Sequence, residues 1–392
     1  MKTFLVRKAL KKYRPRLVVV FGTYGVSEAR FAIAAVLENQ RATVAAPAET
    51  LIEKIAARFT LWQLAMVVAR TGVFPEVCVI SATPDSASYL QLKGILPVTC
   101  AVVMPTGDIT ATKNAFDGQA HAVAAISTEL ERAERAILVI DDKEIAACAQ
   151  GVKVPMVRIG FAKEADVRIE SISYTALPQK RIAAGGMSVR LTYRGAEVLL
   201  HIRDTFGKRS AYAVVAALAV GMHVDAGVEY AASDMRAYEV PNSSFRLCEG
   251  VKRTALFVHT TDVTPQSARE AIRIIGALRS AGQLRRTIIV LGDVLDPGGN
   301  EERLHRALGQ LAAQHANLLY LGGERVIFAE EAARKAGMLP DNIARFDEPA
   351  QAARAAQAEI NAYDGVLILG DEHGAIAQAV EELRAFDTVP KE

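Results

Sequence analysis

The chain has 392 residues and is short of cysteine, of aromatic side chains and of net charge. Its four cysteines lie far apart and form no C-x-x-C pair, so the sequence indicates a reducing compartment rather than a disulfide framework. A formal net charge of +2 excludes a uniformly basic nucleic-acid-binding protein. No apolar run approaches the ~20 residues of a membrane-spanning helix. With 51% hydrophobic residues, the composition predicts a folded protein of the cytoplasm without a transmembrane segment.

One segment departs from this charge balance. Residues 1–16 hold many lysines and arginines and no acidic residue, and no apolar core of a secretory signal follows before Leu17. An organellar presequence and a basic helix lying on an anionic surface are two interpretations of such a segment. We favour a third, a short solvated helix that leads into the first strand.

Short β-branched runs alternate with helix-like stretches along most of the chain. Runs such as Leu17–Gly22 lack polar alternation, which is typical of a parallel sheet covered on both faces. Residues 166–203 do alternate, with a turn at Arg194–Gly195, and predict an antiparallel hairpin. Helices are expected at 115–135, 210–220 and 226–237, and a domain break near 240–244. We therefore predict an α/β fold with a parallel-sheet domain at 1–240 and a Rossmann-like domain at 241–392.

The first predicted strand ends in a glycine-rich turn that opens a helix. A parallel-sheet protein holds phosphate at this position, with backbone N–H groups and the helix N-terminus facing the anion. A working phosphate loop ends in G-K-[ST], but Val26 stands here in place of the lysine. The turn therefore retains only part of the nucleotide-binding pattern, and a tight turn without a ligand is the simpler interpretation. The residues that could form the remnant are Gly22, Thr23, Gly25 and Ser27.

The wider sequence resembles the Mur ligase family, most closely the members that add D-alanyl-D-alanine to a UDP-muramoyl peptide. The similarity includes the loop, the stretch Gly160–Val167, the run Val290–Leu295 and the following Leu304–Gly309. The resemblance implies a central ATPase-type domain followed by the small C-terminal Rossmann-like domain. It also implies that the family's N-terminal, UDP-binding domain is missing, so that binding of a peptidoglycan precursor is doubtful unless another chain supplies that domain.

The resemblance implies a mechanism whose residues can be checked one at a time. In the family, ATP phosphorylates a carboxylate and an amine attacks the acyl phosphate, with Mg²⁺ and a carbamylated lysine stabilising charge. The carbamylated lysine is replaced by Ser127, and the metal-binding glutamate falls near Ser81. A histidine of the family survives as His121, and together with the loop hydroxyl of Ser27 it forms the remnant of the metal site that the resemblance implies. The family's H-N-x-x-N motif, which contacts adenine, corresponds to residues 209–213 and loses its histidine and asparagines.

The C-terminal half of the chain also departs from the family's motifs. The inter-domain arginine of the family corresponds to residues near 243–244, where serines stand. Its polar loop corresponds to residues 259–265, of which Asp262 and Pro265 remain. Asp293 survives too, and its simpler interpretation is a carboxylate that caps a turn. Residues 370–374, which include Gly370, Asp371, His373 and Gly374, stand where the family ends its last strand in a K-G-S-R-G-like turn.

These departures predict a catalytically lapsed homologue that serves as a binding or scaffold protein, linked to cell-wall synthesis. Losing one charge-stabilising group alone costs ~10²–10³ in rate. No cofactor is then expected, and a protein partner or a second copy of the chain is the expected partner rather than nucleic acid. The alternative is an active ATP-dependent amide ligase with a rewired site, using ATP and Mg²⁺. In that case Lys208, just before the nucleotide-contacting helix, is the best substitute cation, ahead of Lys113 and Lys163.

Overall fold

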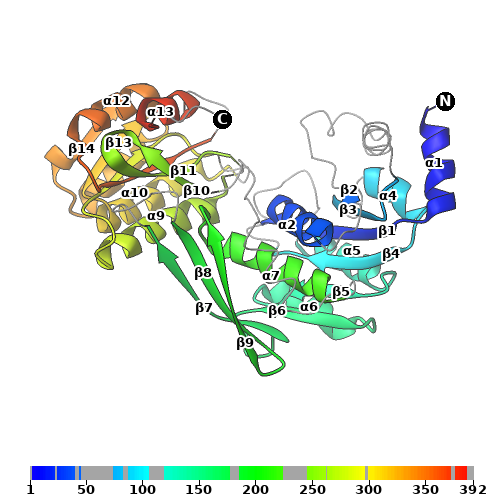
Figure 1. Ribbon diagram of the computed structural model, residues 1–392. Coiled ribbons are helices and arrows are strands. Elements are labelled where there is room, and N and C mark those ends of the chain that lie inside the picture. Colours follow the sequence, from blue (N-terminus) through cyan, green and yellow to red (C-terminus); the bar gives the residue numbers. More distant parts are fainter. Residues whose placement is uncertain are drawn as a thin grey trace, which may run out of the picture. The chain divides into compact units, whose positions relative to one another are not determined.

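The computed structural model describes most of the chain (Figure 1). By contacts the chain divides into two compact units. Unit 1 consists of residues 1–172, 189–200 and 208–238, and unit 2 of residues 173–188, 201–207 and 239–392. The described residues are 2–22, 24–39, 44–45, 74–82, 87–105, 119–176, 185–223, 245–261, 263–295, 299–371 and 376–385.

A nine-stranded sheet of the described residues has the order β2-β3-β1-β4-β5-β6-β7-β8-β9. Its first seven strands, as far as β7, pair in parallel. The bounds are β1 Arg16–Phe21, β2 Val44–Ala45, β3 Val77–Ser81, β4 Val98–Val103, β5 Ala136–Val139, β6 Met156–Gly160, β7 Val167–Thr175, β8 Gly186–Tyr193 and β9 Ala196–Arg203.

Helices cover both faces of the parallel part of this sheet. On β1, Leu17, Val19 and Phe21 belong to a core cluster that also contains Leu10 and Tyr89 from helices of one face. Helices α2 and α7 pack on each other and on the sheet strands. The uninterrupted apolar run of β1 is thereby explained, because neither face meets water. The helices of unit 1 are α1 Lys2–Tyr13, α2 Val26–Asn39, α4 Ala87–Lys93, α5 Gln119–Leu130, α6 Lys143–Gly151 and α7 Lys208–His223.

Strands β8 and β9 form the predicted hairpin. Arg194 and Gly195 both have positive φ, 51° and 82°, as the two central residues of a type I′ turn require. Glycine tolerates this region freely, whereas arginine pays a small strain. Buried residues alternate with half-buried or exposed ones along most of β8, so the hairpin is half exposed as the sequence predicted.

Unit 2 contains a six-stranded sheet of described residues in the order β10-β11-β15-β12-β13-β14. Only β10 pairs antiparallel, with β11. Separate core clusters lie on the two faces of this sheet. The elements are β10 Arg246–Gly250, η5 Val251–Arg253, β11 Thr254–His259, α9 Pro265–Ser280, β12 Thr287–Leu291, α10 Glu301–His315, β13 Leu318–Gly322, α11 Ile327–Lys335, η6 Pro340–Asn342, β14 Ile343–Phe346, α12 Pro349–Glu359, β15 Gly365–Leu369 and α13 Ile376–Leu383.

The structure differs from the sequence expectation at several places. Strand β6 was not predicted, because MVRIG is short and carries an arginine. Helix α5 is shorter than the predicted 115–135, since residues 131–135 form a turn that leads into β5. The helix expected at 226–237 and the break near 240–244 lie outside the described residues. None of the described helices is both long and apolar enough to span a bilayer.

The four cysteines are free thiols, and three of them are buried. Burial raises the pKa of Cys78 and of Cys100 to about 12. Cys148 is buried as well. These side chains act as small apolar groups of the core rather than as nucleophiles.

Candidate functional site

The glycine turn lies between the end of β1 and the start of α2, at the carboxyl edge of the parallel sheet. Gly22 has φ +127°, and a Cβ atom there would lie 2.5 Å from the carbonyl oxygen of Met104. The turn therefore packs tightly against the end of β4. The N–H of Tyr24 donates to the carbonyl oxygen of Pro105 at 3.0 Å, so this donor is used inside the protein. Thr23 lies outside the described residues.

The helix that follows begins without a cation. Val26 and Ser27 are half-buried in its first turn, and Val26 supplies no charge for a phosphate group. Gly25 has φ +78°, and a Cβ atom there would meet the side chains of Arg209 and Met104. These two side chains pack directly against the loop. The space beside Gly25 is thus filled by the protein itself.

A buried carboxylate in the first turn of α2 joins this helix to α7. Glu28 is 2% exposed, and its Oε1 lies 3.1 Å from Nε of Arg209, which is 7% exposed. The hydroxyl of Ser210 donates to Oε2 of the same carboxylate at 2.7 Å. Arg209 and Ser210 stand where the resemblance implies adenine-contacting residues. In this chain both bind a carboxylate of the protein, so they serve the packing of α2 on α7.

A second carboxylate, that of Asp141, connects α7 to the turn after β6. Asp141 accepts hydrogen bonds from the N–H groups of Phe161 and Ala162, at 2.7 and 2.8 Å. The hydroxyl of Tyr212 on α7 donates to it at 2.8 Å. Asp141 lies two residues after the end of β5 at Val139, and its carboxylate anchors the turn after β6.

Lys208 is exposed at the start of α7. Its Nζ lies 5.0 Å from the centre of the Phe161 ring, an arrangement that allows a cation–π contact. Phe161 in turn meets Tyr212 edge to face, with ring centres 5.9 Å apart. The structure thus places the predicted substitute cation on an aromatic side chain of unit 1.

The positions expected to hold a metal ion carry other chemistry. Nη1 of Arg30, a buried side chain, lies 3.5 Å from the hydroxyl of Ser81, where the resemblance implies a metal-binding glutamate. Ser127 hydrogen-bonds the thiol of Cys148, which opposes the rise in thiol pKa caused by burial. His121 lies on α5, and its side chain is outside the described part. A buried guanidinium beside Ser81 repels a divalent cation, so the described residues do not fit Mg²⁺.

No cluster of three or more histidine, cysteine, aspartate or glutamate side chains suited to a metal ion occurs among the described residues.

In unit 2 the retained positions have structural contacts. Pro265 begins α9, and Thr264 and Ser267 form a capping box at that end. Ser267 also hydrogen-bonds Nε2 of the buried His259 at 2.8 Å. Asp262, Lys113, Gly374 and residues 243–244 lie outside the described residues, so their expected roles stay predictions.

Asp293 follows β12 and holds the turn after β13. Its carboxylate accepts from the N–H groups of Glu324 and Arg325 at 3.2 and 2.9 Å. A Cβ atom on Gly323 would lie 2.8 Å from the same carboxylate. These contacts agree with the simpler interpretation of Asp293, a carboxylate that caps a turn.

His305 packs behind Asp293 and is fully buried. Its Nε2 accepts the N–H of Val294 at 3.2 Å, and Nδ1 lies 2.8 Å from the carbonyl oxygen of Glu301. An acceptor at one nitrogen and a donor at the other define the neutral imidazole. Burial lowers the pKa of His305, although the carboxylates of Asp293 and Glu301 oppose this shift.

We expect this histidine to make unit 2 less stable in mild acid. Because the folded-state pKa of His305 lies below its unfolded value of about 6.5, the unfolded chain binds the proton first as pH falls. The neutral His305 therefore contributes fully to the stability of unit 2 above the unfolded pKa. Below that pKa the free energy of unfolding falls by up to ~1.4 kcal/mol per pH unit. The pKa of His315 is lowered by burial as well and adds in the same direction.

Chemical unfolding between pH 7.5 and 5.5 measures this effect. The variant His305→Gln, which cannot titrate, is expected to be less stable at pH 7.5 but to depend less on pH. Equal slopes for the variant and the unmodified chain would show that His305 is not the titrating group.

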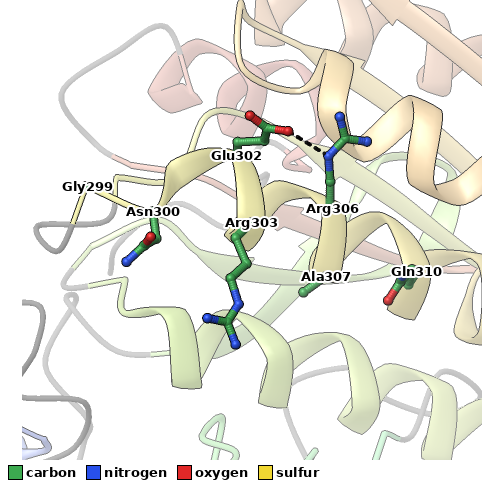
Figure 2. A pocket seen from close by; sticks show the side chains of 7 residues that line it. All are labelled: Gly299, Asn300, Glu302, Arg303, Arg306, Ala307 and Gln310. Atoms are coloured by element: carbon green, nitrogen blue, oxygen red, sulfur yellow. Dashed lines mark hydrogen bonds and ion pairs between the residues drawn. The ribbon is translucent and has the colours of Figure 1, made fainter.

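A groove of about 520 Å³ opens at the start of α10 in unit 2. Figure 2 shows Glu302 paired with Arg306 on one side of the helix, while Arg303 points to the other. None of the predicted site residues lines it. The lining residues are Gly299, Asn300, Glu302, Arg303, Arg306, Ala307 and Gln310.

The structure thus brings together only part of the predicted remnant. Gly25 lies against the side chain of Arg209, the residue that follows Lys208. Sequence reasoning missed the partners Glu28 and Arg209, which are separated by most of unit 1 in the chain. An acidic residue directly after the glycine turn was the one available signal.

Comparison with known proteins supports a relationship to one family. Residues 256–372 match the family model described as "Mur ligase, glutamate ligase domain". Among curated proteins, no sequence matches the chain.

Solved structures resemble nearly the whole chain. The MurF ligase of Thermotoga maritima in complex with ADP has 14% identity and a TM-score of 0.75, over 97% of this chain and 82% of that one. MurF of Acinetobacter baumannii has 16% identity and a TM-score of 0.72, over 97% and 79%. A pseudomurein peptide ligase type C of Methanothermus fervidus has 12% identity and a TM-score of 0.59, over 96% and 80%. The predicted resemblance to the Mur ligases and the predicted α/β fold class are confirmed.

Proposed function

We propose that this chain, which has the Mur ligase fold and a match to the Mur ligase C-terminal domain, is a catalytically lapsed homologue acting as a binding or scaffold protein. The relationship itself indicates an ATP-dependent ligase wherever activity is retained. We propose a link to cell-wall synthesis because two of the similar structures are described as a murein peptide ligase and a pseudomurein peptide ligase.

One observation carries the proposal: the groups that should meet the nucleotide are bound to the protein. Arg209 and Ser210 hold the buried carboxylate of Glu28, and the N–H of Tyr24 donates to Pro105. A phosphate loop works because its N–H groups and a lysine face the anion together. Here the lysine is absent at Val26, and a carboxylate stands two residues further on. Binding ATP would therefore require breaking internal contacts, without the family's loop lysine to compensate.

The metal side supports the same proposal. Charge stabilisation of an acyl phosphate needs cations placed where the charge develops. Ser127 is uncharged, and Arg30 takes up the space beside Ser81. Arg30 is a cation, but it is buried, and its guanidinium cannot act as a metal ligand. Together these positions leave the chain without the family's means of activating a carboxylate.

The competing function is an active ligase with a rewired nucleotide site. The exposed Lys208 at the start of α7 is the observation that favours it, because its ammonium is close to a loop of unit 1. Its contact with the Phe161 ring gives that ammonium a second role, in packing.

We expect Mg-ATP at millimolar concentration to leave the melting temperature of the chain unchanged. A ligand present at about 100 times its Kd would add about 2.7 kcal/mol of stability, a shift that is easily seen. Differential scanning fluorimetry and calorimetric titration measure this. An active MurF ligase treated in the same way provides the positive control.

The variant Val26→Lys tests whether the missing lysine alone prevents nucleotide binding, or whether the internal contacts of the loop prevent it too. Since the Tyr24 N–H and the Arg209 side chain remain engaged, we expect this variant not to bind Mg-ATP either. Binding by the unmodified chain, or ADP release with a UDP-muramoyl peptide and D-alanyl-D-alanine, would refute the proposed function.

A further inference from the structure

The amino edge of the unit 1 sheet is strongly basic. Because β1, β3, β4, β5 and β6 run parallel, the segments that enter these strands all lie at one edge. We call these segments, together with the second half of α1, the basic edge. Its cations are Lys8, Lys11, Lys12, Arg14, Arg16, Lys93, Arg132, Arg135 and Lys153.

These cations outnumber the acidic residues of the same segments, Glu76, Glu129, Glu131 and Glu134. One of those acids is neutralised locally: Glu129 is buried, and its carboxylate lies 2.6 Å from Nζ of Lys93 and 3.4 Å from Nη1 of Arg132. The excess of positive charge therefore comes chiefly from α1 and the turn that follows it.

The cations in the second half of α1 and in the turn after it are exposed to solvent. Lys8, Lys11, Lys12 and Arg14 are exposed, and no carboxylate within the described ranges forms an ion pair with them. Residues 8, 11 and 12 are three and four apart, so they occupy one face of the helix. Such unpaired cations repel each other, which costs stability that an anionic partner would restore.

Large apolar side chains are exposed among these charges. Tyr13, at the end of α1, is 58% exposed and stacks on Phe74 with ring centres 4.8 Å apart. Leu90 on α4 is 45% exposed. Leu10 of α1 shares a core cluster with neighbours of Leu90, and Figure 1 draws α1 and α4 at the same end of unit 1. Aromatic and aliphatic groups interspersed with lysines suit the interface of a bilayer, where rings sit at the headgroup level.

We propose that the basic edge docks unit 1 on an anionic lipid surface. Clusters of four to eight lysines and arginines on an amphipathic helix bind anionic headgroups, and each cation strengthens binding by about fivefold. Nucleic acid would satisfy the same charges, but the exposed Tyr13 and Leu90 favour a bilayer over a phosphate backbone. This surface is separate from the glycine turn, which lies at the opposite edge of the sheet, so the inference does not depend on the proposed function.

Vesicle flotation of the full chain tests this directly, in the absence of nucleotide. We expect binding to vesicles of phosphatidylcholine mixed with phosphatidylglycerol, little binding to phosphatidylcholine alone, and loss of binding as salt is raised, because exposed charges are screened. The triple variant Lys8→Glu, Lys11→Glu, Lys12→Glu should bind the anionic vesicles at least ~100-fold more weakly.

A matched control reverses the same amount of charge elsewhere. Arg273, Arg303 and Lys335 are exposed residues of unit 2, and their triple replacement by glutamate should retain most of the binding. Because all six positions are exposed, both variants should keep the far-UV circular dichroism of the unmodified chain. Equal loss in both variants would show a net-charge effect and overturn the docking surface.

The variant Leu90→Ser separates a bilayer from nucleic acid. It should weaken vesicle binding several-fold while leaving the salt dependence unchanged. The inference is overturned by absence of binding at low salt, by equal binding to neutral vesicles, or by an RNA oligomer that binds more tightly than vesicles and is unaffected by Leu90→Ser.

Discussion

Replacing Glu28 by alanine is expected to lower the free energy of unfolding of unit 1 by about 3–5 kcal/mol. Glu28 and Arg209 are almost fully buried, and the variant leaves a guanidinium without its carboxylate in the interface of α2 and α7. The hydroxyl of Ser210 loses its acceptor at the same time. Urea unfolding followed by far-UV circular dichroism measures the change.

Two further variants make this prediction specific. Glu38→Ala removes an exposed carboxylate from the same helix, and a change within about 0.5 kcal/mol is expected. The double variant Glu28→Leu with Arg209→Met replaces the whole pair by apolar groups and should recover much of the loss, since no charge remains unpaired. Additive losses in the double variant would mean that the two side chains do not act as a pair.

Gly309→Ala is expected to destabilise unit 2 by about 3 kcal/mol or more. Helices α10 and α11 approach so closely at Gly309 that an added Cβ atom would overlap the carbonyl oxygen of Ala329. The obstacle is helix backbone, so the two helices must separate to admit the methyl group. Alanine favours a helix interior by ~1 kcal/mol over glycine, which is too little to offset the clash.

Gly151→Ala provides the control for this glycine effect. Gly151 is also a helix residue, at the end of α6, but nothing lies within 4 Å of a Cβ atom placed there. Its replacement should leave stability unchanged or slightly raised. If Gly309→Ala behaved like Gly151→Ala in calorimetry, the close approach of α10 and α11 would be wrong.

Local patterns predicted the regular elements well, because burial on one or two faces imposes a period on the sequence. The run Leu17–Gly22 has no polar residue and forms a central strand, and Arg194–Gly195 adopts the predicted turn. Where the pattern was weak the prediction failed: β6 has an arginine among its five residues and was missed.

The candidate site was less predictable because its decisive contacts join distant parts of the chain. The missing lysine at Val26 was visible, but the partner of Glu28 is Arg209, which no local spacing indicates. Likewise Asp141 could be recognised as following a strand, while its bonds to Phe161 and Tyr212 depend on the packing of α7.

Apolar runs at strand and helix periods were enough to predict two α/β domains, and the motifs at Gly160–Val167 and Val290–Leu295 carried the resemblance to the Mur ligases. Both kinds of signal can be read from residue order alone. The tertiary structure decided how the retained residues are used. It pairs Glu28 with Arg209 and places exposed lysines, which form no ion pair within the described part of the chain, at one sheet edge. The energy of a charge depends on which groups surround it in space rather than on its neighbours in the chain.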